Sequence, residues 1–252
     1  MNDIDNLRDL INNANKIVFF GGAGVSTESG IPDFRSEKGL YKAQQEFGKS
    51  PEEMISHSFF LKDTDTFFSY YKTNMLYPEA LPNDAHKGLA DIEKNGKQIS
   101  IVTQNIDGLH QMAGSTKVYE LHGSIHRNFC LDCGASYDLK YILDPNNCAD
   151  KKGITKDVPY CEKCGGIVKP DVVLYEEPLD SVTMHNAVMA IGDADLLIVG
   201  GTSLVVYPAA SFVNYFNGDK LVLINKSSTN IDGRADIVIR EPIGEVFSEL
   251  NF

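Results

Sequence analysis

Lys16-Ile17-Val18-Phe19-Phe20-Gly21-Gly22-Ala23-Gly24 joins a short apolar run to a turn with closely spaced glycines. The run from Lys16 to Phe20 is rich in Ile, Val and Phe, which is typical of a buried strand. Gly22 and Gly24 let a backbone approach a pyrophosphate closely, and a following helix would supply N–H donors at its N-terminus. The stretch therefore indicates a strand and turn that could bind a nucleotide, although many tight strand–helix turns also contain two glycines.

Further short apolar runs recur along the chain and are separated by stretches with helical spacing. Ile4, Leu7 and Ile11 begin this pattern, and Asn2 or Asp3 is available as a helix cap. Strands that alternate with helices predict an α/β fold, a Rossmann-like and mostly parallel sheet with helices on both faces. The later strands are expected at residues 98–103, 118–121, 172–175, 196–199, 221–224 and 237–239, and the later helices begin near residues 84, 181 and 208.

Four of the five cysteines form two pairs, Cys130-x-x-Cys133 and Cys161-x-x-Cys164. Each Cys-x-x-Cys turn places two thiolates on one side of a metal, and two such turns complete a tetrahedron. Four thiolate ligands leave no open position, so the motif predicts a structural zinc site in a zinc-ribbon insert; redox pairs or core thiols are the alternatives. Cys148 is unpaired, and we expect it to be a small side chain within the insert.

The segments that do not fit the alternating pattern are expected to form a smaller domain inserted into the main one. Residues 37–80 are aromatic and interrupted by Pro51 and polar residues, which indicates short helices. Residues 123–169 contain the four paired cysteines and show little apolar periodicity. We therefore expect a discontinuous nucleotide-binding domain of residues 1–36, 81–122 and 170–252, with both inserts in the small domain.

Polar clusters fall where the expected strands end, at residues 22–35, 104–107, 122, 200–203 and 225. Ligands bind beyond the carboxyl ends of strands in open parallel sheets, so these clusters should line one rim. The chain matches a standard dehydrogenase poorly, because Thr27 replaces the third glycine of the dinucleotide fingerprint and the usual acidic ribose ligand is missing. The Asn225 amide could hold an adenosine ribose instead.

Three residues of this rim have both a catalytic and a structural interpretation. His122 follows a strand and precedes a glycine, and an unperturbed pKa near neutrality suits a general base. A hydrogen-bonded structural histidine is the alternative. Asn105 and Asp107 could bind a ligand, or could simply form a turn.

Composition limits the classes of partner. The chain has 252 residues, of which 42% are hydrophobic, and this suits one large domain with a smaller insert. The formal net charge of −12 argues against nucleic acid, because phosphate binding needs clustered Lys and Arg. An acidic surface could attract a Lys-rich polypeptide, or could serve solubility alone. We see no signal segment and no apolar run near the roughly 20 residues of a membrane span, so we expect a soluble cytoplasmic protein without a membrane partner.

Together these motifs resemble those of the sirtuin family of NAD-dependent protein deacylases, in its bacterial type, over nearly the whole chain. The resemblance lies in the cysteine quartet and in the stretches Gly22–Ser26, Gly30–Ser36, Thr103–His110, Leu121–Gly123 and Gly201–Pro208. It implies that acetyl-lysine, NAD and water give lysine, nicotinamide and O-acetyl-ADP-ribose. NAD would be consumed as a co-substrate, and the zinc would be structural.

The resemblance also implies roles for individual residues. His122 would be the general base that removes a ribose hydroxyl proton, and an acylated-lysine peptide would add as a strand between residues 172–177 and 204–207. The zinc ligands would be Cys130, Cys133, Cys161 and Cys164. The NAD-binding residues would be Ala23, Gly24, Ser26 and Thr27 at the pyrophosphate, Phe34 and Arg35 over the nicotinamide ribose, Gln104 and Asn105 at the ribose, Ile106 and Asp107 at the carboxamide, His122, and Thr202, Ser203, Asn225 and the backbone near Ile243 at the adenosine half. The peptide would contact Val172, Val173, Leu174, Tyr175, Glu176 and Val206.

Two departures from the family pattern bear on the substrate. Glu176 replaces the glycine of a common Phe-Gly-Glu, so its Cβ and charge could obstruct the peptide channel or favour a basic residue in the substrate. Members that remove acidic acyl groups carry a Tyr-x-x-Arg pair, whereas Phe68-Ser69-Tyr70-Tyr71 stands here, which predicts a preference for acetyl or another neutral acyl group.

Two alternatives to a deacetylase stay open. An ADP-ribosyltransferase would be favoured if Glu176 blocks the acyl-lysine channel. A non-catalytic NAD-sensing or partner-binding module is the other, and the set of Asn105, Asp107 and His122 argues against it, because a binding module needs no base.

Overall fold

Six parallel strands form the central sheet of the larger of two lobes. The computed structural model describes residues 2–33, 47–148 and 157–252. The chain begins the sheet in its middle, extends it on one side, and then returns to the other side of the first strand. The strands are β1 (Lys16–Gly21), β2 (Gln98–Thr103), β3 (Val118–Glu120), β7 (Leu196–Gly200), β8 (Lys220–Ile224) and β9 (Ile237–Ile239). Their order, β3-β2-β1-β7-β8-β9, is that of a Rossmann-like fold, and its direction reverses between β1 and β7.

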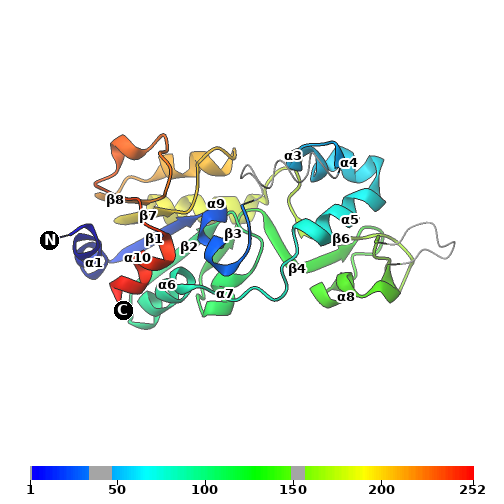
Figure 1. Ribbon diagram of the computed structural model, residues 1–252, viewed down its shortest axis with the longest axis horizontal. Coiled ribbons are helices and arrows are strands. Elements are labelled where there is room, and N and C mark those ends of the chain that lie inside the picture. The colour runs from blue at the N-terminus through cyan, green and yellow to red at the C-terminus, as the bar shows by residue number, and fades with distance from the viewer. Residues whose placement is uncertain (1, 34–46, 149–156) are drawn as a thin grey trace.

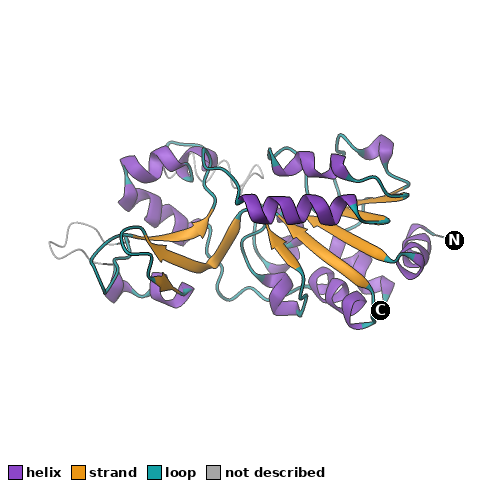
Figure 2. Cartoon of the chain, turned by 180° about the vertical axis from the view of Figure 1, so that it is seen from behind, coloured by secondary structure: helices purple, strands orange, loops and turns teal. Residues whose placement is uncertain are grey.

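Helices cover both faces of this sheet (Figures 1 and 2). One face carries α1 (Asp3–Asn13), α6 (Asp84–Lys94) and α10 (Ile243–Leu250), and the other carries α9 (Ser181–Gly192) and the 3-10 helix η4 (Ala209–Tyr215). Neighbouring residues of a strand point to opposite faces, so Phe19 and Phe20 of β1 belong to different cores, and both are fully buried. Burial on both faces explains why these strands are continuous apolar runs. The same lobe also contains the short helices α7 (Leu109–Ala113) and η5 (Asp232–Arg234).

The starts of two helices follow capping residues in the sequence. Asn2 caps α1 and Asn83 caps α6, each by accepting a backbone N–H of the first turn. The Asn83 amide also donates to the Val25 carbonyl at 2.7 Å and to the Ser29 hydroxyl at 3.0 Å. The start of α6 is therefore tied to the chain that follows β1.

The glycine run after β1 forms two 3-10 turns, η1 (Ala23–Val25) and η2 (Thr27–Ser29), rather than the start of an α-helix. Gly24 N–H donates to the Gly201 carbonyl at 2.8 Å, and the N–H groups of Val25 and Ser26 close the first turn. The α-helix expected directly after the glycine run is therefore replaced by 3-10 turns, in which the N–H groups of Gly24, Val25 and Ser26 are paired within the protein. The loop after β7 and the turn itself already use these N–H groups.

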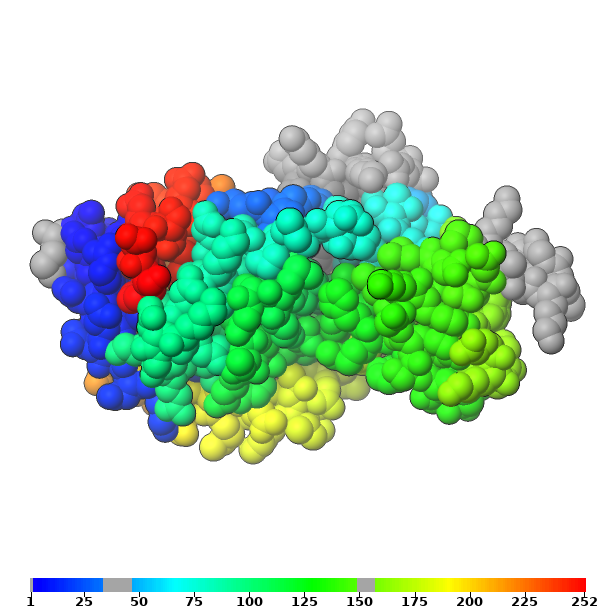
Figure 3. Space-filling view, turned by 90° about the horizontal axis from the view of Figure 1, so that it is seen from below, coloured from blue at the N-terminus to red at the C-terminus, as the bar shows by residue number. Residues whose placement is uncertain are grey.

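The smaller lobe combines a three-stranded antiparallel sheet with short helices around a second core. The helix α5 gives this core its largest aromatic side chains, among them Phe67, Phe68 and Tyr71. The elements are α3 (Pro51–Met54), α4 (His57–Lys62), α5 (Thr64–Asn74), β4 (Gly123–Cys130), β5 (Ser136–Tyr137), α8 (Leu139–Leu143), η3 (Pro145–Asn147) and β6 (Val168–Val172). In the space-filling view the two lobes form one elongated body (Figure 3).

The strand predicted at residues 172–175 is not part of the parallel sheet. β6 ends at Val172, which pairs with Gly123 of β4, and the chain continues as a loop in which Tyr175 forms one bridge with Ser56. Leu174 of this loop is buried in the core of the smaller lobe. A run of four apolar residues fits a strand or a core-facing loop equally well, and here the neighbouring lobe decides between them.

None of the helices in the described ranges is long and apolar enough to cross a membrane.

Candidate active site

A pocket opens at the carboxyl ends of the parallel strands, and both lobes contribute to its walls. Segments that follow β1, β2 and β7 contribute Ala23, Asn105 and Thr202, while the smaller lobe contributes Ile55 and Ile125. The pocket thus lies where the strand order reverses, which is the usual ligand position in an open parallel sheet.

The pocket brings together residues from most of the segments singled out in the sequence. Of the residues predicted to bind NAD, those that line it are Ala23, Ser26, Gln104, Asn105, Ile106, Asp107, His122, Thr202 and Ser203. Of those predicted to contact the peptide, Val172, Val173, Leu174, Tyr175, Glu176 and Val206 line it. Phe34 and Arg35 lie outside the described residues.

Four of the predicted NAD-binding residues, Gly24, Thr27, Asn225 and Ile243, are not among the residues that line the pocket. Asn225 directly follows β8, and its side-chain amide donates to the Ser227 carbonyl at 2.8 Å. Ile243 begins α10 and its side chain packs in the core.

Glycines let the loops after β1 and β7 meet closely. A Cβ on Gly24 would lie 2.8 Å from the Gly201 Cα and carbonyl oxygen, and a Cβ on Gly22 would lie 2.9 Å from the Thr202 Cβ. Gly201 itself has a φ of +58°, which favours glycine. The two loops therefore present backbone at the switch point, as the close approach of a dinucleotide pyrophosphate requires.

Ser26, Asn105 and Asp107 form a connected polar group in the pocket. The Ser26 hydroxyl donates to the Asp107 carboxylate at 2.7 Å, and the Asn105 amide donates to the Ser26 hydroxyl at 3.0 Å. Burial raises the pKa of the Asp107 carboxyl, and hydrogen bonds from Leu109 N–H and Ser26 oppose that rise. Asp107 also accepts the Leu109 N–H at 3.0 Å, so it forms a turn as well as lining the pocket.

His122 stands between the two lobes, directly before β4. Its Nδ1 lies 2.9 Å from the carbonyl oxygen of Gln104. A carbonyl can only accept, so Nδ1 carries the hydrogen and Nε2 is the acceptor nitrogen of the neutral ring. The Gln104 side chain in turn donates to the Thr202 hydroxyl at 3.1 Å, which links the loops after β2 and β7. The ring is therefore held in the tautomer that a general base needs.

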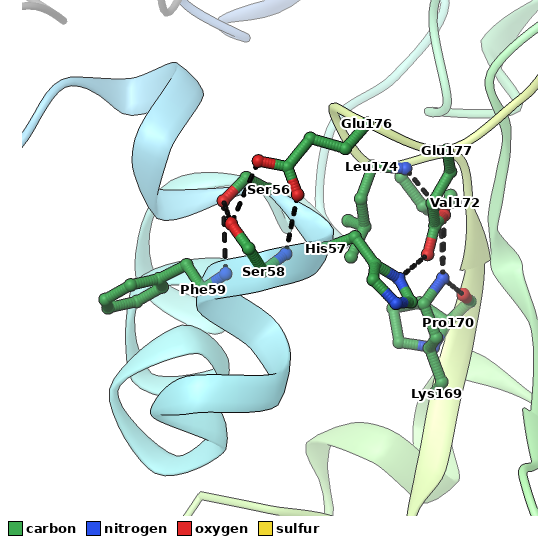
Figure 4. Close-up of polar contacts among 10 residues, drawn as sticks. All are labelled: Ser56, His57, Ser58, Phe59, Lys169, Pro170, Val172, Leu174, Glu176 and Glu177. Carbon is green, nitrogen blue, oxygen red and sulfur yellow. Dashed lines mark hydrogen bonds and ion pairs between the residues drawn. The ribbon is translucent and has the colours of Figure 1, made fainter.

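The loop after β6 borders the pocket and is fastened to the smaller lobe (Figure 4). Both backbone groups of Tyr175 are already paired, its N–H with the Ile55 carbonyl at 3.1 Å and its carbonyl with the His57 N–H at 3.0 Å. Val173 N–H donates to the His122 carbonyl at 3.0 Å. An extended peptide thus cannot pair along the whole predicted stretch.

Several lining residues were missed from the sequence. Asn74, Met75 and Tyr77, which end α5 or follow it, face the pocket, as do Ile55 and Leu179. No motif marks these positions, and only the folding of the insert against the sheet brings them to the site. Burial raises the pKa of the Tyr77 hydroxyl.

The four paired cysteines converge in the smaller lobe. Their sulfur atoms all lie within 4.8 Å of one another, with 3.4 Å between Cys130 and Cys164 and 3.6 Å between Cys133 and Cys161. Tetrahedral ligands at a Zn–S distance of about 2.3 Å would be roughly 3.8 Å apart, so the quartet fits zinc. Burial opposes ionisation of Cys161, but hydrogen bonds led by the Tyr137 hydroxyl outweigh it and lower the pKa of this thiol to about 6.

Comparisons with known proteins give the same family over most of the chain. A family model described as the Sir2 family matches residues 22–208. An NAD-dependent protein deacetylase of Clostridium acetobutylicum is 57% identical over 246 residues, which cover 98% of this chain and 97% of that protein. A protein of the same name from Clostridium tetani is 59% identical over 241 residues, or 96% of this chain and 94% of that one.

Solved structures are also similar. One described as Sir2 with a p53 peptide and NAD+ has a TM-score of 0.84 at 33% identity, and covers 99% of this chain and 97% of that chain. A Sir2 structure with a propionylated peptide has a TM-score of 0.83 at 33% identity, and the match covers 98% of this chain and 96% of that chain.

Proposed function

Because the chain belongs to the Sir2 family, we infer that it is an NAD-dependent protein-lysine deacetylase. Its substrates are acetyl-lysine in a protein or peptide, NAD and water, and its products are lysine, nicotinamide and O-acetyl-ADP-ribose. The observation that supports this most is His122, whose ring lines a pocket at the switch point of the sheet beside Asn105 and Asp107. A module that only bound NAD would need no base there.

The pocket residues would bind, orient and accept a proton. NAD supplies a ribose carbon that becomes reactive when nicotinamide leaves. Asn105 and Asp107, joined through Ser26, would hold the nicotinamide ribose and carboxamide in place. His122 would take a proton from a ribose hydroxyl through Nε2, and the Gln104 carbonyl on Nδ1 would stabilise the positive ring that results.

Further contacts complete the proposal. Ala23 would border the pyrophosphate, Ile106 the carboxamide, and Thr202 and Ser203 the adenosine half. We keep Gly24, Thr27, Asn225, the Ile243 backbone, Phe34 and Arg35 as proposed NAD contacts. Cytoplasmic localisation, and a lack of nucleic-acid and membrane partners, also stay predictions.

One assay tests the function against its alternatives. Purified protein is mixed with NAD and an acetyl-lysine peptide, and both nicotinamide release and peptide mass are measured. Deacetylation gives nicotinamide and a lighter peptide. Nicotinamide with a heavier peptide or protein would instead identify an ADP-ribosyltransferase, and a mixture in which neither product forms would identify a sensor.

We propose that the acyl group is neutral. The described residues that line the pocket include Asp33, Asp107, Glu176 and Glu177 but no Lys or Arg, so none of these described side chains offers a Lys or Arg cation to an acidic acyl chain. Phe68 and Tyr71 stand at the positions of the Tyr and the Arg in the Tyr-x-x-Arg pair of members that remove acidic acyl groups. Both side chains are buried in the core of the smaller lobe. An acetyl-lysine peptide should therefore be cleaved faster than its succinyl counterpart, and the reverse order would contradict this preference.

A further inference from the structure

Glu176 adopts a backbone conformation that residues with a side chain rarely adopt. Its φ is +78°, in the left-handed region where glycine is favoured. This accounts for the glycine that the family pattern has at this position. A glutamate here is unfavourable for the backbone, so contacts of its side chain must hold the conformation.

The side chain of Glu176 has such contacts, and they lie on the smaller lobe (Figure 4). One carboxylate oxygen accepts the Ser58 N–H at 2.8 Å, and the other accepts the Ser58 hydroxyl at 2.9 Å. Ser58 is the second residue of α4, so its N–H belongs to the first turn and has no partner within the helix. Glu176 therefore binds the start of α4 instead of extending across the peptide channel.

Glu177 also holds the loop after β6 against α4. Its carboxylate lies 2.8 Å from His57 Nδ1 and 3.3 Å from Lys169 Nζ, and it accepts the Leu174 N–H at 2.9 Å. Burial disfavours the charged form of Glu177, but these hydrogen bonds and the Lys169 charge outweigh it and lower its pKa. Two consecutive carboxylates thus fasten the loop to the first two residues of α4.

The attachment determines which backbone groups remain available to a peptide. Both backbone groups of Tyr175 are paired with Ile55 and His57. Within the described part of the chain, the N–H and carbonyl of Glu176 form no hydrogen bond, and Glu176 lines the pocket. Strand addition at this turn of the loop would therefore use the N–H and carbonyl of Glu176 rather than those of Tyr175.

Resting on the proposed deacetylase function, we propose that Glu176 is a positioning residue for the substrate peptide. Its carboxylate, held by Ser58, fixes the left-handed turn that presents the Glu176 N–H and carbonyl to the peptide backbone. The side chain thereby replaces the conformational freedom of glycine with an anchor on α4. The channel stays open because the carboxylate is bound to Ser58.

Steady-state kinetics with the full-length protein, NAD and an acetyl-lysine peptide test this role. Glu176→Ala removes the anchor but keeps the unfavourable backbone, and we expect the KM for the peptide to rise roughly three- to tenfold, as for loss of a partly exposed charge-assisted hydrogen bond. The kcat and the KM for NAD should change less than about twofold, because Glu176 touches neither His122 nor the Ser26 group in the pocket.

Two further variants separate anchoring from other effects. Glu176→Gln keeps an acceptor for the Ser58 N–H and a partner for its hydroxyl, so it should restore most of the peptide affinity lost in Glu176→Ala. Glu176→Gly loses the anchor but tolerates the left-handed turn. Its KM for the peptide should therefore lie between those of Glu176→Gln and Glu176→Ala. Glu79→Ala, at an exposed glutamate, is the matched control.

A double-mutant cycle with Ser58→Ala shows whether Glu176 acts through Ser58. Ser58→Ala should raise the peptide KM in the wild-type background and have no effect in Glu176→Ala. An unchanged peptide KM in Glu176→Ala, or a lower KM in Glu176→Gly than in the wild type, would overturn the inference while the deacetylase function stands. Absence of deacetylation by the wild-type protein would overturn the function, and the inference with it.

Discussion

His122 is oriented by the hydrogen bond from its Nδ1 to the Gln104 carbonyl at 2.9 Å, which leaves Nε2 as the acceptor nitrogen of the neutral ring. Removal of a general base typically costs about 10²–10⁴-fold in rate, so His122→Ala should nearly abolish deacetylation. The thermal midpoint should change little, because the ring is only half-buried. His185→Ala, at an exposed position on α9, should keep wild-type turnover. Turnover by His122→Ala comparable to that of the wild type would refute the assignment of the base.

Two other histidines make stability depend on pH. His86 and His110 are buried with ring centroids 4.7 Å apart, and both His110 nitrogens lack a hydrogen-bond partner among the described residues. Burial lowers the pKa of His86 to about 4, and burial with the neighbouring His86 lowers that of His110 well below its ordinary value.

The unfolded chain therefore binds these protons more readily than the folded one. Above the unfolded pKa of about 6.5 the two histidines do not alter stability, and below it each removes about 1.4 kcal/mol per pH unit until its folded pKa is reached. Urea unfolding at pH 7 and pH 5.5 should show a fall in the free energy of unfolding. His110→Phe should show a smaller fall, because one titrating group is gone. An equal fall in both proteins would show that other groups cause it.

Among the elements, the two turns that meet at the switch point leave little room for a larger residue. A Cβ on Gly24 would lie 2.8 Å from backbone atoms of Gly201, which cannot move aside as a flexible side chain could. Gly24→Ala should therefore displace the loop after β1 or that after β7, at a cost of about 1–3 kcal/mol in stability, and weaken NAD binding. Chemical unfolding and calorimetric titration with NAD measure the two effects. Gly233→Ala is the control, since no atom lies within 4 Å of a Cβ there. Equal stability and equal NAD affinity of Gly24→Ala and Gly233→Ala would show that the close approach of Gly24 to Gly201 does not limit the side chain at this position.

The same elements show what the sequence can and cannot reveal. α1 and β1 were predictable because their signals are local, an asparagine cap followed by helical spacing and then a run buried on both faces. The run 172–175 was misassigned because its partners, Ser56 and the core of the smaller lobe, come from segments far away in the chain. Likewise, the polar residues that line the pocket were predictable because they directly follow strands of the sheet. Asn74 and Tyr77 were not, because they reach the pocket only through the packing of the insert.

At the scale of the whole molecule, the hydrophobic core is divided between the lobes. Two clusters cover the faces of the parallel sheet, and a third, which includes Cys130 and Cys161, fills the smaller lobe. We propose that residues 37–80 and 123–169 form the small domain and that the remainder forms the NAD-binding domain, with the boundary at residue 169 falling within β6 and the core of the smaller lobe reaching on to Leu174. The chain passes between the lobes beside His122 and again near Val172, so the pocket needs both lobes in place.

Removal of zinc should therefore abolish activity through the smaller lobe without removing a catalytic group. Zinc binding and folding are coupled, and the quartet joins the end of β4 to the chain before β6. After treatment with a strong chelator, we expect hydrogen exchange to accelerate in β4, β6 and α5, while β1 and β7 keep their protection. The loop after β6 should lose its attachment to α4, so deacetylation should stop. Cys133→Ser should reproduce this pattern, whereas Cys148→Ala, whose sulfur is outside the quartet, should keep one zinc per chain. Full protection of β4 after complete loss of metal would contradict the structural role of zinc, because the sulfur atoms would then be stable together without an ion to bind.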